Sequence, residues 1–153
     1  MQFIDMYYFA YGSNMDGAQM RKRCSNFALI GPALLKNYRI AFTIFSPRRK
    51  CGCADIIPSV GSAAPGLLYE IHEKDIENFD RYENVKEHMY RRVTVSVIGN
   101  DGAMFPCETY EVVHKTEGLL PSKEYIGVMR TAAEKFSFPE KHVRFLADMA
   151  TID

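Results

Sequence analysis

The sequence lacks the charge imbalance that draws proteins to polyanions. Its 153 residues include 19 Lys or Arg and 19 Asp or Glu, so the formal net charge at pH 7 is zero. We therefore expect no nucleic-acid partner and no attraction to anionic membranes. No apolar stretch approaches the roughly 20 residues that a membrane-spanning helix needs. The first five residues contain no basic group, and Asp5 interrupts their apolar run. These features predict no signal peptide, no membrane association and a cytoplasmic location.

Signatures of metal, nucleotide and serine-hydrolase sites are also missing. The four cysteines include one close pair, Cys51 and Cys53, which lacks zinc-finger spacing and has no second pair to complete it. The four histidines are scattered and form no HExxH pattern. Neither GxGxxG nor GxxxxGK[ST] occurs, and no GxSxG surrounds Ser13. We expect structural thiols and no metal.

What remains is the composition of an ordinary soluble globular protein, with 47% hydrophobic and 25% charged residues. A chain of 153 residues can bury a normal core. No repeat, low-complexity tract or linker divides it. The sequence therefore predicts a single domain over residues 1–153.

The most informative segment is Tyr8–Asn14, with the sequence YFAYGSN. Its aromatic and small apolar residues predict a strand that stops at Gly12. Asp16 and Gln19 then have the spacing of a capping box, which predicts a helix over about 17–23. A strand, a glycine turn and a helix start therefore follow one another closely.

This connection has the properties of an anion cradle. Gly12 lets a ligand approach the main chain closely. Free N–H groups at such a turn favour a negatively charged group through hydrogen bonds and the helix dipole. An ordinary strand–helix connection is the alternative, and for an isolated Gly-Ser-Asn it is the more common one.

The rest of the chain predicts a mixed α+β fold around a curled sheet. Short β-branched and aromatic runs indicate strands at 28–36, 38–45, 53–57, 66–71, 93–98 and 103–113. A Pro/Gly/Ser-rich turn separates 57 from 66, and Asp101-Gly102 is a strong hairpin signal. Helices are expected at 73–83, 122–135 and 139–149.

Glu83 is the strongest candidate for acid–base chemistry. In the helix over 73–83 it shares the inward-facing stripe of Ile76 and Phe79. Asn84 is a plausible stop, so Glu83 lies at the negative end of the helix. Desolvation and the helix dipole should both raise the pKa of its carboxyl toward the range of a general base. Alternatively, Glu83 turns outward or pairs with Arg81 or Arg91.

Several other side chains have two interpretations. The basic triplet 48–50 lies in an expected loop at 46–52; it is either solvated or borders the mouth of an acid-binding pocket. Tyr8 and Tyr11 are three residues apart and should face differently, so one of them is expected to be structural. Tyr125 either hydrogen-bonds a ligand or packs its helix on the sheet. Tyr90 is expected to be a strand residue, near enough to Glu83 to orient it.

Residues 8–14 resemble the YFAYGSN signature of the γ-glutamylcyclotransferase family, the AIG2-like proteins. Further blocks resemble the family in the same order, and together they span about residues 7 to 130: 53–58, 66–71, 80–85, 90–92 and Tyr125. The resemblance implies a small mixed β-barrel flanked by helices. It also implies cyclisation of a γ-glutamyl group to 5-oxoproline with release of an amine or amino acid, without cofactor or metal.

The resemblance assigns roles to particular residues. Glu83 matches the family's catalytic glutamate, the general base and acid. The implied substrate-binding residues are Tyr8, Phe9, Ala10, Tyr11, Gly12, Ser13, Asn14 and Tyr125. Asn14 favours the branch that acts on small γ-glutamyl amino acids or amines over the glutathione-specific branch, in which YGSL is expected. The alternatives are a non-catalytic module that binds a small acid and a protein–protein interaction domain. The leaving group and the oligomeric state are not determined by the sequence.

Overall fold

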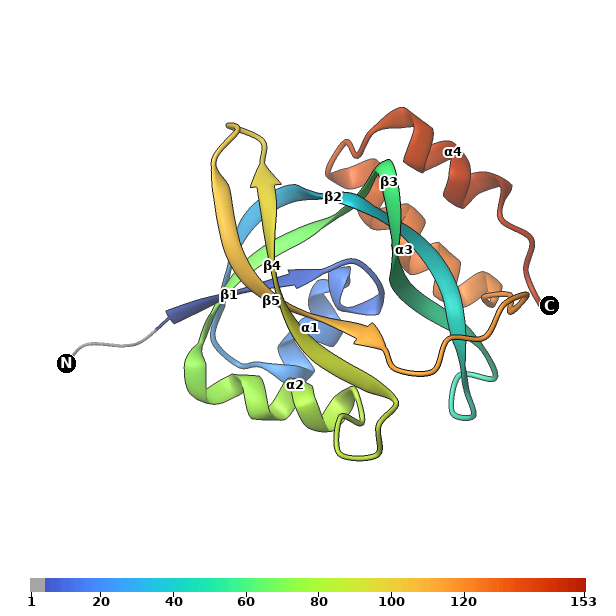
Figure 1. Cartoon of the computed structure of the whole chain (residues 1–153), viewed down its shortest axis with the longest axis horizontal. Helices are drawn as coiled ribbons and strands as arrows, with labels where there is room; N and C mark the ends of the chain where they lie inside the picture. The colour runs from blue at the N-terminus through green and yellow to red at the C-terminus, as the bar shows by residue number, and fades with distance from the viewer. Residues whose placement is uncertain (1–4) are drawn as a thin grey trace.

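Two long strands build most of the sheet. β2 (Phe27–Ser46) and β3 (Cys51–His72) pair antiparallel along almost their whole length. β1 (Asp5–Ala10), β4 (Tyr90–Gly99) and β5 (Met104–Val112) complete a closed barrel with the strand order β1-β3-β2-β4-β5. This is a computed structural model that describes residues 5–153, so the expectation about the amino terminus falls largely outside the described residues. The predicted α+β barrel flanked by helices is confirmed (Figure 1).

The long strands correct the predicted turn between 57 and 66. β3 runs through this segment, and a register shift opposite Asn37 accommodates extra residues of β3 as a bulge. Asn37 has a φ of 66° and Gly61 a φ of 86°, and the Gly61 N–H donates to Asn37 Oδ1 at 3.1 Å. Pro, Gly and Ser are tolerated at bulges as well as in turns, because both need irregular backbone. The strands predicted at 28–36 and 38–45 are likewise one strand, bulged at Asn37.

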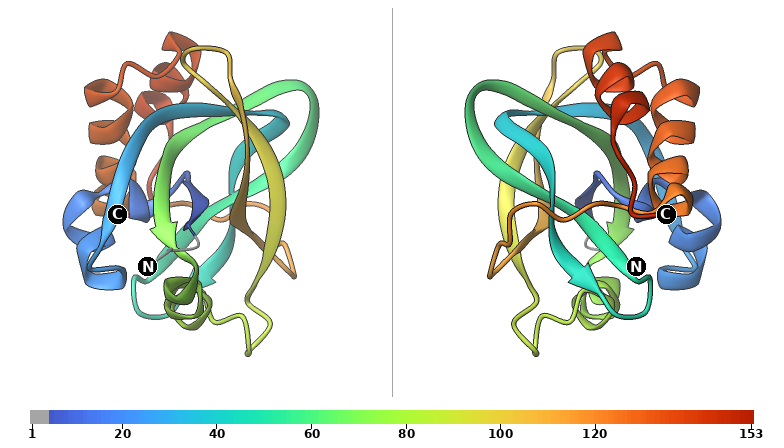
Figure 2. Two further views of the ribbon diagram at one scale, coloured as in Figure 1. Left: turned by 90° about the vertical axis from the view of Figure 1, so that its left-hand side faces the viewer. Right: turned by 90° about the vertical axis from the view of Figure 1, so that its right-hand side faces the viewer.

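The helices lie outside the barrel. A 3-10 turn (Ser13–Met15) leads into α1 (Gly17–Arg23), and a second (Glu73–Asp75) leads into α2 (Ile76–Tyr82). α3 (Lys123–Lys135) and α4 (Glu140–Asp148) lie side by side on one flank, with α2 at one end (Figure 2). None of the helices described over 5–153 has the length and apolar character required to cross a bilayer.

Only half of the predicted capping box forms. The Asp16 carboxylate accepts a hydrogen bond from the Ala18 N–H, as the sequence predicts. The Gln19 side chain does not reach back to Asp16 and instead donates to Ser13 Oγ and Asn14 Oδ1. Ser13 and Asn14 in the preceding loop, together with Arg49 from the β2–β3 turn, therefore take the place of Asp16 as partners of Gln19.

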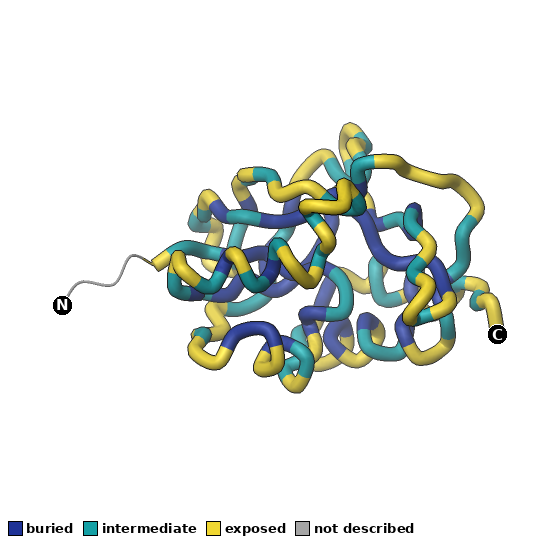
Figure 3. Tube along the Cα trace, turned by 90° about the horizontal axis from the view of Figure 1, so that it is seen from below, coloured by how far each residue is buried: buried dark blue, intermediate teal, exposed yellow. Residues whose placement is uncertain are grey.

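The core fills the barrel and the spaces under the helices (Figure 3). Phe9 is fully buried there and packs against the backbone of Gly66. A Cβ at Gly66 would lie 2.5 Å from the carbonyl oxygen of Ala10 and 2.6 Å from the Phe9 ring. The absence of a side chain at Gly66 therefore lets β3 approach β1 closely at Ala10, the last residue of β1.

Candidate active site

One pocket of about 550 Å³ lies where β1 ends, between the β2–β3 turn, the segment after α2 and the end of β5. All predicted site residues except Phe9 and Ala10 line it: Tyr8, Tyr11, Gly12, Ser13, Asn14, Glu83 and Tyr125. Phe9 and Ala10 are buried in the core instead. The structure thus gathers three segments that are distant in sequence around one cavity.

Glu83 occupies the C-cap of α2, at the point where the helix is forced to stop. Asn84 has a φ of 53°; its N–H bonds the Arg81 carbonyl, and the Val85 N–H bonds that of Asp80. These two bonds form a Schellman motif, in which asparagine substitutes for the usual glycine. The sequence prediction of a stop at Asn84 agrees with this geometry, which holds Glu83 at the pocket wall.

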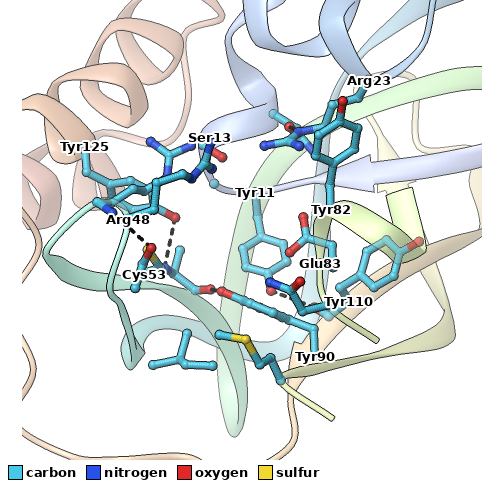
Figure 4. A pocket seen from close by; sticks show the side chains of 18 of the residues that line it. Tyr11, Ser13, Arg23, Arg48, Cys53, Tyr82, Glu83, Tyr90, Tyr110 and Tyr125 are labelled. Atoms are coloured by element: carbon cyan, nitrogen blue, oxygen red, sulfur yellow. Dashed lines mark hydrogen bonds between the residues drawn. The ribbon is translucent and has the colours of Figure 1, made fainter. Parts of the chain in front are cut away.

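The Glu83 carboxylate points into the pocket between Tyr11, Tyr82 and Tyr110 (Figure 4). Burial raises the pKa of this carboxyl to about 7, although the positive charges of Arg23, Arg49 and Arg48 act to lower it. Within residues 5–153, no side chain hydrogen-bonds or ion-pairs with it.

The two arginines that the sequence offers as partners for Glu83 bind other residues. Arg81 hydrogen-bonds Asn78, and Arg91 pairs with Glu111. Glu83 therefore holds a proton that it can exchange near neutral pH, beside space for a ligand.

Tyr8 and Tyr11 both face the pocket, so the expectation that they face differently is wrong. That expectation assumes a continuous strand, in which residues three apart point to opposite faces. β1 ends at Ala10, and the turn that follows brings Tyr11 to the same side as Tyr8. The Tyr11 hydroxyl donates to the Tyr110 carbonyl at 2.6 Å, and this bond to β5 orients the Tyr11 ring.

Asn14 organises the loop rather than offering its side chain to a ligand. Its Nδ2 donates to the Tyr8 hydroxyl at 2.8 Å, and its Oδ1 accepts from Gln19 at 3.0 Å and from Arg23 Nε at 2.8 Å. The Tyr69 hydroxyl donates to the Asn14 carbonyl. The backbone of this loop, unlike the Asn14 side chain, has unpaired donors. Among residues 5–153, the N–H groups of residues 12–14 have no protein acceptor. Unpaired N–H groups at a turn are what the predicted anion cradle requires.

The backbone of one residue, Ala54, orients two tyrosine hydroxyls in opposite senses. The Ala54 N–H donates to the Tyr125 hydroxyl, and the Tyr90 hydroxyl donates to the Ala54 carbonyl, each at 2.9 Å. The hydrogen of Tyr125 is thus left to donate to a ligand, whereas Tyr90 offers a lone pair. Burial raises the pKa of both hydroxyls well above their usual range, which keeps them protonated. Tyr125 also packs edge-on to Phe42, so both of its predicted roles are compatible with the structure.

Arginines supply a positive field that the sequence only partly indicated. Arg48 and Arg49 line the pocket, which agrees with the interpretation that the basic triplet borders its mouth. Arg23 was not identified from the sequence. It is only 8% exposed, its guanidinium lies 4.0 Å from the centre of the Tyr82 ring, and it also lines the pocket. A basic residue in the last turn of a helix is common, so no local signal distinguishes Arg23.

The described part of the chain contains neither a reactive cysteine nor a cluster of metal ligands. Cys24, Cys51, Cys53 and Cys107 are free and buried. Cys53 lines the pocket, but burial raises the pKa of its thiol to about 12, so it remains neutral. Over residues 5–153, no three His, Cys, Asp or Glu side chains come together as metal ligands.

Comparisons with known proteins identify a matching family and several relatives. The family model described as the AIG2-like family matches residues 65–146. A bovine (Bos taurus) gamma-glutamylcyclotransferase is 26% identical over 145 residues, covering 91% of this chain and 76% of that protein. The putative gamma-glutamylcyclotransferase YkqA of Bacillus subtilis (strain 168) is 30% identical over 138 residues, covering 88% of this chain and 49% of YkqA.

Solved structures share the architecture. A structure of a gamma-glutamyl cyclotransferase superposes with a TM-score of 0.92 at 24% identity, covering 98% of this chain and 90% of that one. The crystal structure of YkqA from Bacillus subtilis gives a TM-score of 0.81 at 28% identity, covering 96% of this chain and 56% of YkqA. At 24% identity, the similarity to the first of these structures shows that the two chains share a fold.

Proposed function

This chain belongs to the AIG2-like family, and from that membership we propose that it is a γ-glutamylcyclotransferase. It cyclises the γ-glutamyl group of a small γ-glutamyl amino acid or amine to 5-oxoproline and releases the amine. The observation that carries the proposal is the Glu83 carboxyl, which faces the pocket, has no side-chain partner among residues 5–153 and has a pKa of about 7. A non-catalytic sensor of small acids has no use for such a carboxyl beside its anion cradle.

The reaction requires proton transfers that one carboxyl can serve. The α-amino nitrogen attacks the γ-carbonyl carbon, a new C–N bond closes the five-membered ring, and the original amide C–N bond breaks. The attacking nitrogen gives up two protons in all, and the leaving nitrogen gains two. Glu83 takes one of these protons from the attacking nitrogen and returns it to the departing one, and solvent exchanges the other. A pKa near 7 suits both directions, because the α-ammonium has an unperturbed pKa of about 8.

The cradle after β1 supplies the second requirement, which is orientation of the glutamyl group. We propose that the N–H groups of residues 12–14 bind the substrate α-carboxylate. Arg23, which donates to Asn14 Oδ1 at 2.8 Å, adds positive charge beside this loop. The lone pair of Tyr90 can accept a hydrogen bond from the α-ammonium. Holding the chain folded makes the attack intramolecular, and such positioning alone contributes several kcal/mol.

The third requirement is stabilisation of the oxyanion that forms on the γ-carbonyl oxygen. Tyr125 is suited to donate to it, because the Ala54 N–H occupies its acceptor side. A preorganised donor of this kind is typically worth about 3 kcal/mol of transition-state stabilisation.

The buried free cysteines fit a reducing compartment, so we further propose a cytoplasmic enzyme.

The test is formation of 5-oxoproline from a panel of γ-glutamyl amino acids and amines by the wild type and by Glu83→Gln. The amide cannot act as a base, so we expect the variant to lose at least about a hundredfold in kcat. Glu87→Gln is the matched control: it removes the same charge from an exposed side chain at the same pocket, four residues after Glu83. Binding of ligands without turnover by the wild type would instead identify a binding module, and equal turnover by both variants would refute the role of Glu83.

A further inference from the structure

The β2–β3 turn holds two arginines at the mouth of the pocket in a defined conformation. The Lys50 N–H bonds the Ser46 carbonyl, the Arg49 N–H bonds Ser46 Oγ, and Lys50 has a φ of 56°. At the base of the turn, the Gly52 N–H donates to the Leu120 carbonyl at 2.8 Å. The turn is therefore anchored to itself and to the segment before α3.

Arg49 is also tied to the ligand cradle. Its Nη2 donates to Gln19 Oε1 at 2.9 Å, and the same Gln19 donates to Ser13 and Asn14. Its guanidinium lies 5.3 Å from the centre of the Tyr125 ring. Arg48, by contrast, is exposed, and no ion pair to it occurs within residues 5–153. One arginine is thus positioned by the site, and the other is available to a ligand.

A second hollow adjoins the pocket at these arginines. It has a volume of about 260 Å³ and shares Arg48, Arg49 and Tyr125 with the main pocket. Its remaining lining residues are Gln19, Ser122 and Glu124. Glu124 is the one carboxylate among them, so the two arginines leave the hollow with a net positive charge. In Figure 4, Arg48 and Tyr125 lie across the pocket from Glu83 and Tyr110.

The charges of the main pocket exceed what a simple substrate would balance. Four arginines line it (Arg23, Arg48, Arg49 and Arg81), against the two carboxyls of Glu83 and Glu87. A γ-glutamyl conjugate of a neutral amino acid carries one net negative charge, because its α-ammonium cancels one of its two carboxylates. A conjugate of an acidic amino acid carries two, and the extra carboxylate needs a positive site beyond the reacting atoms.

We propose that Arg48 and Arg49 form a subsite for a negatively charged leaving group, so that the preferred substrates are γ-glutamyl conjugates of acidic amino acids. The inference rests on the proposed function, since it assigns the leaving-group side of the same pocket. Glu83 and the cradle hold the glutamyl end, and the acidic side chain of the leaving amino acid enters the second hollow. Arginine suits this role because its planar guanidinium binds a carboxylate through two hydrogen bonds.

The experiment compares γ-glutamyl-glutamate with γ-glutamyl-glutamine, two substrates of nearly the same shape that differ by one charge. A hydrogen bond between charged groups predicts a kcat/KM ratio of at least about tenfold in favour of the glutamate conjugate. Arg48→Gln and Arg49→Gln should each bring this ratio toward one, and so should 1 M salt. Lys50→Gln is the matched control: it removes the same charge from the same turn, and Lys50 lines neither hollow.

A binding measurement separates failure of the subsite from failure of the proposed reaction. In Glu83→Gln the conjugates should not be consumed, so calorimetry can measure the ratio of their dissociation constants. An affinity ratio above tenfold that Arg48→Gln abolishes supports the subsite even if the wild type forms no 5-oxoproline, an outcome that would refute only the proposed function. Equal affinities, or a preference that both arginine variants retain, would overturn the subsite.

Discussion

Replacement of Glu83 by glutamine should stabilise the protein at neutral and alkaline pH but not at acid pH. Burial raises the pKa of this carboxyl from 4.5 to about 7. A raised pKa means that the folded state binds the proton more tightly than the unfolded state does. The stability contributed by the neutral carboxyl is therefore fully present below pH 4.5 and is lost as the pH rises through 7.

The expected magnitude follows from the two pKa values. They differ by about 2.5 pH units, and each unit corresponds to about 1.36 kcal/mol, so the ionised carboxylate costs about 3 kcal/mol of stability above pH 7. Glutamine has nearly the same shape and is neutral at every pH. We expect Glu83→Gln to be more stable by about 3 kcal/mol at pH 8, by about 2 kcal/mol near pH 6, and by almost nothing at pH 4. For a domain of this size, 3 kcal/mol corresponds to roughly 6 to 12 °C in Tm.

The assay is urea denaturation of the wild type and both glutamine variants between pH 4 and pH 8.5. Glu87→Gln removes the same charge from an exposed side chain, so its stability should stay within about 0.5 kcal/mol of the wild type throughout. A stability difference for Glu83→Gln that does not change with pH would show that the Glu83 carboxylate is well solvated. The argument that desolvation prepares it as a base would then fail.

Two further predictions concern packing and the orientation of the tyrosines. Gly66→Ala should destabilise the fold by at least about 3 kcal/mol, because its Cβ would lie 2.5 Å from a carbonyl oxygen. Gly127→Ala has open space around it and should stabilise α3 by about 0.5–1 kcal/mol. Denaturation midpoints measure both effects, and equal effects would contradict the close approach of β1 to Gly66. Tyr125→Phe should lower kcat about a hundred- to a thousandfold, because it removes a donor to the oxyanion. Tyr90→Phe should chiefly raise KM. Steady-state kinetics on one substrate separate the two effects, and the reverse pattern would refute the assigned hydrogen directions.

Much of the site was predictable because its parts depend on interactions between near neighbours in sequence. The end of β1, the Asp16 cap and the Schellman motif after Glu83 all form within a few residues. The inward stripe of α2 likewise follows from helical periodicity, and both Ile76 and Phe79 are buried as predicted. Local rules failed where tertiary partners competed, as they did for Gln19, and where a bulge used the same residue types as a turn.

The order of residues is enough to establish most of the helices and strands, the glycine turn after β1 and the helix end at Glu83. It is enough because caps, turns and periodicity are decided over one or two helical turns. Which side chains meet depends instead on the tertiary structure. Tyr11 is held by Tyr110, 99 residues away, and Tyr125 by Ala54, 71 residues away. The register of β2 and β3 places Arg48 and Arg49 of the β2–β3 turn at the mouth of the pocket. The packing of Phe9 against Gly66 places the Phe9 ring in the core. Such contacts depend on how the whole barrel closes, because the direction of a side chain is fixed only when the strand that carries it has found its partners.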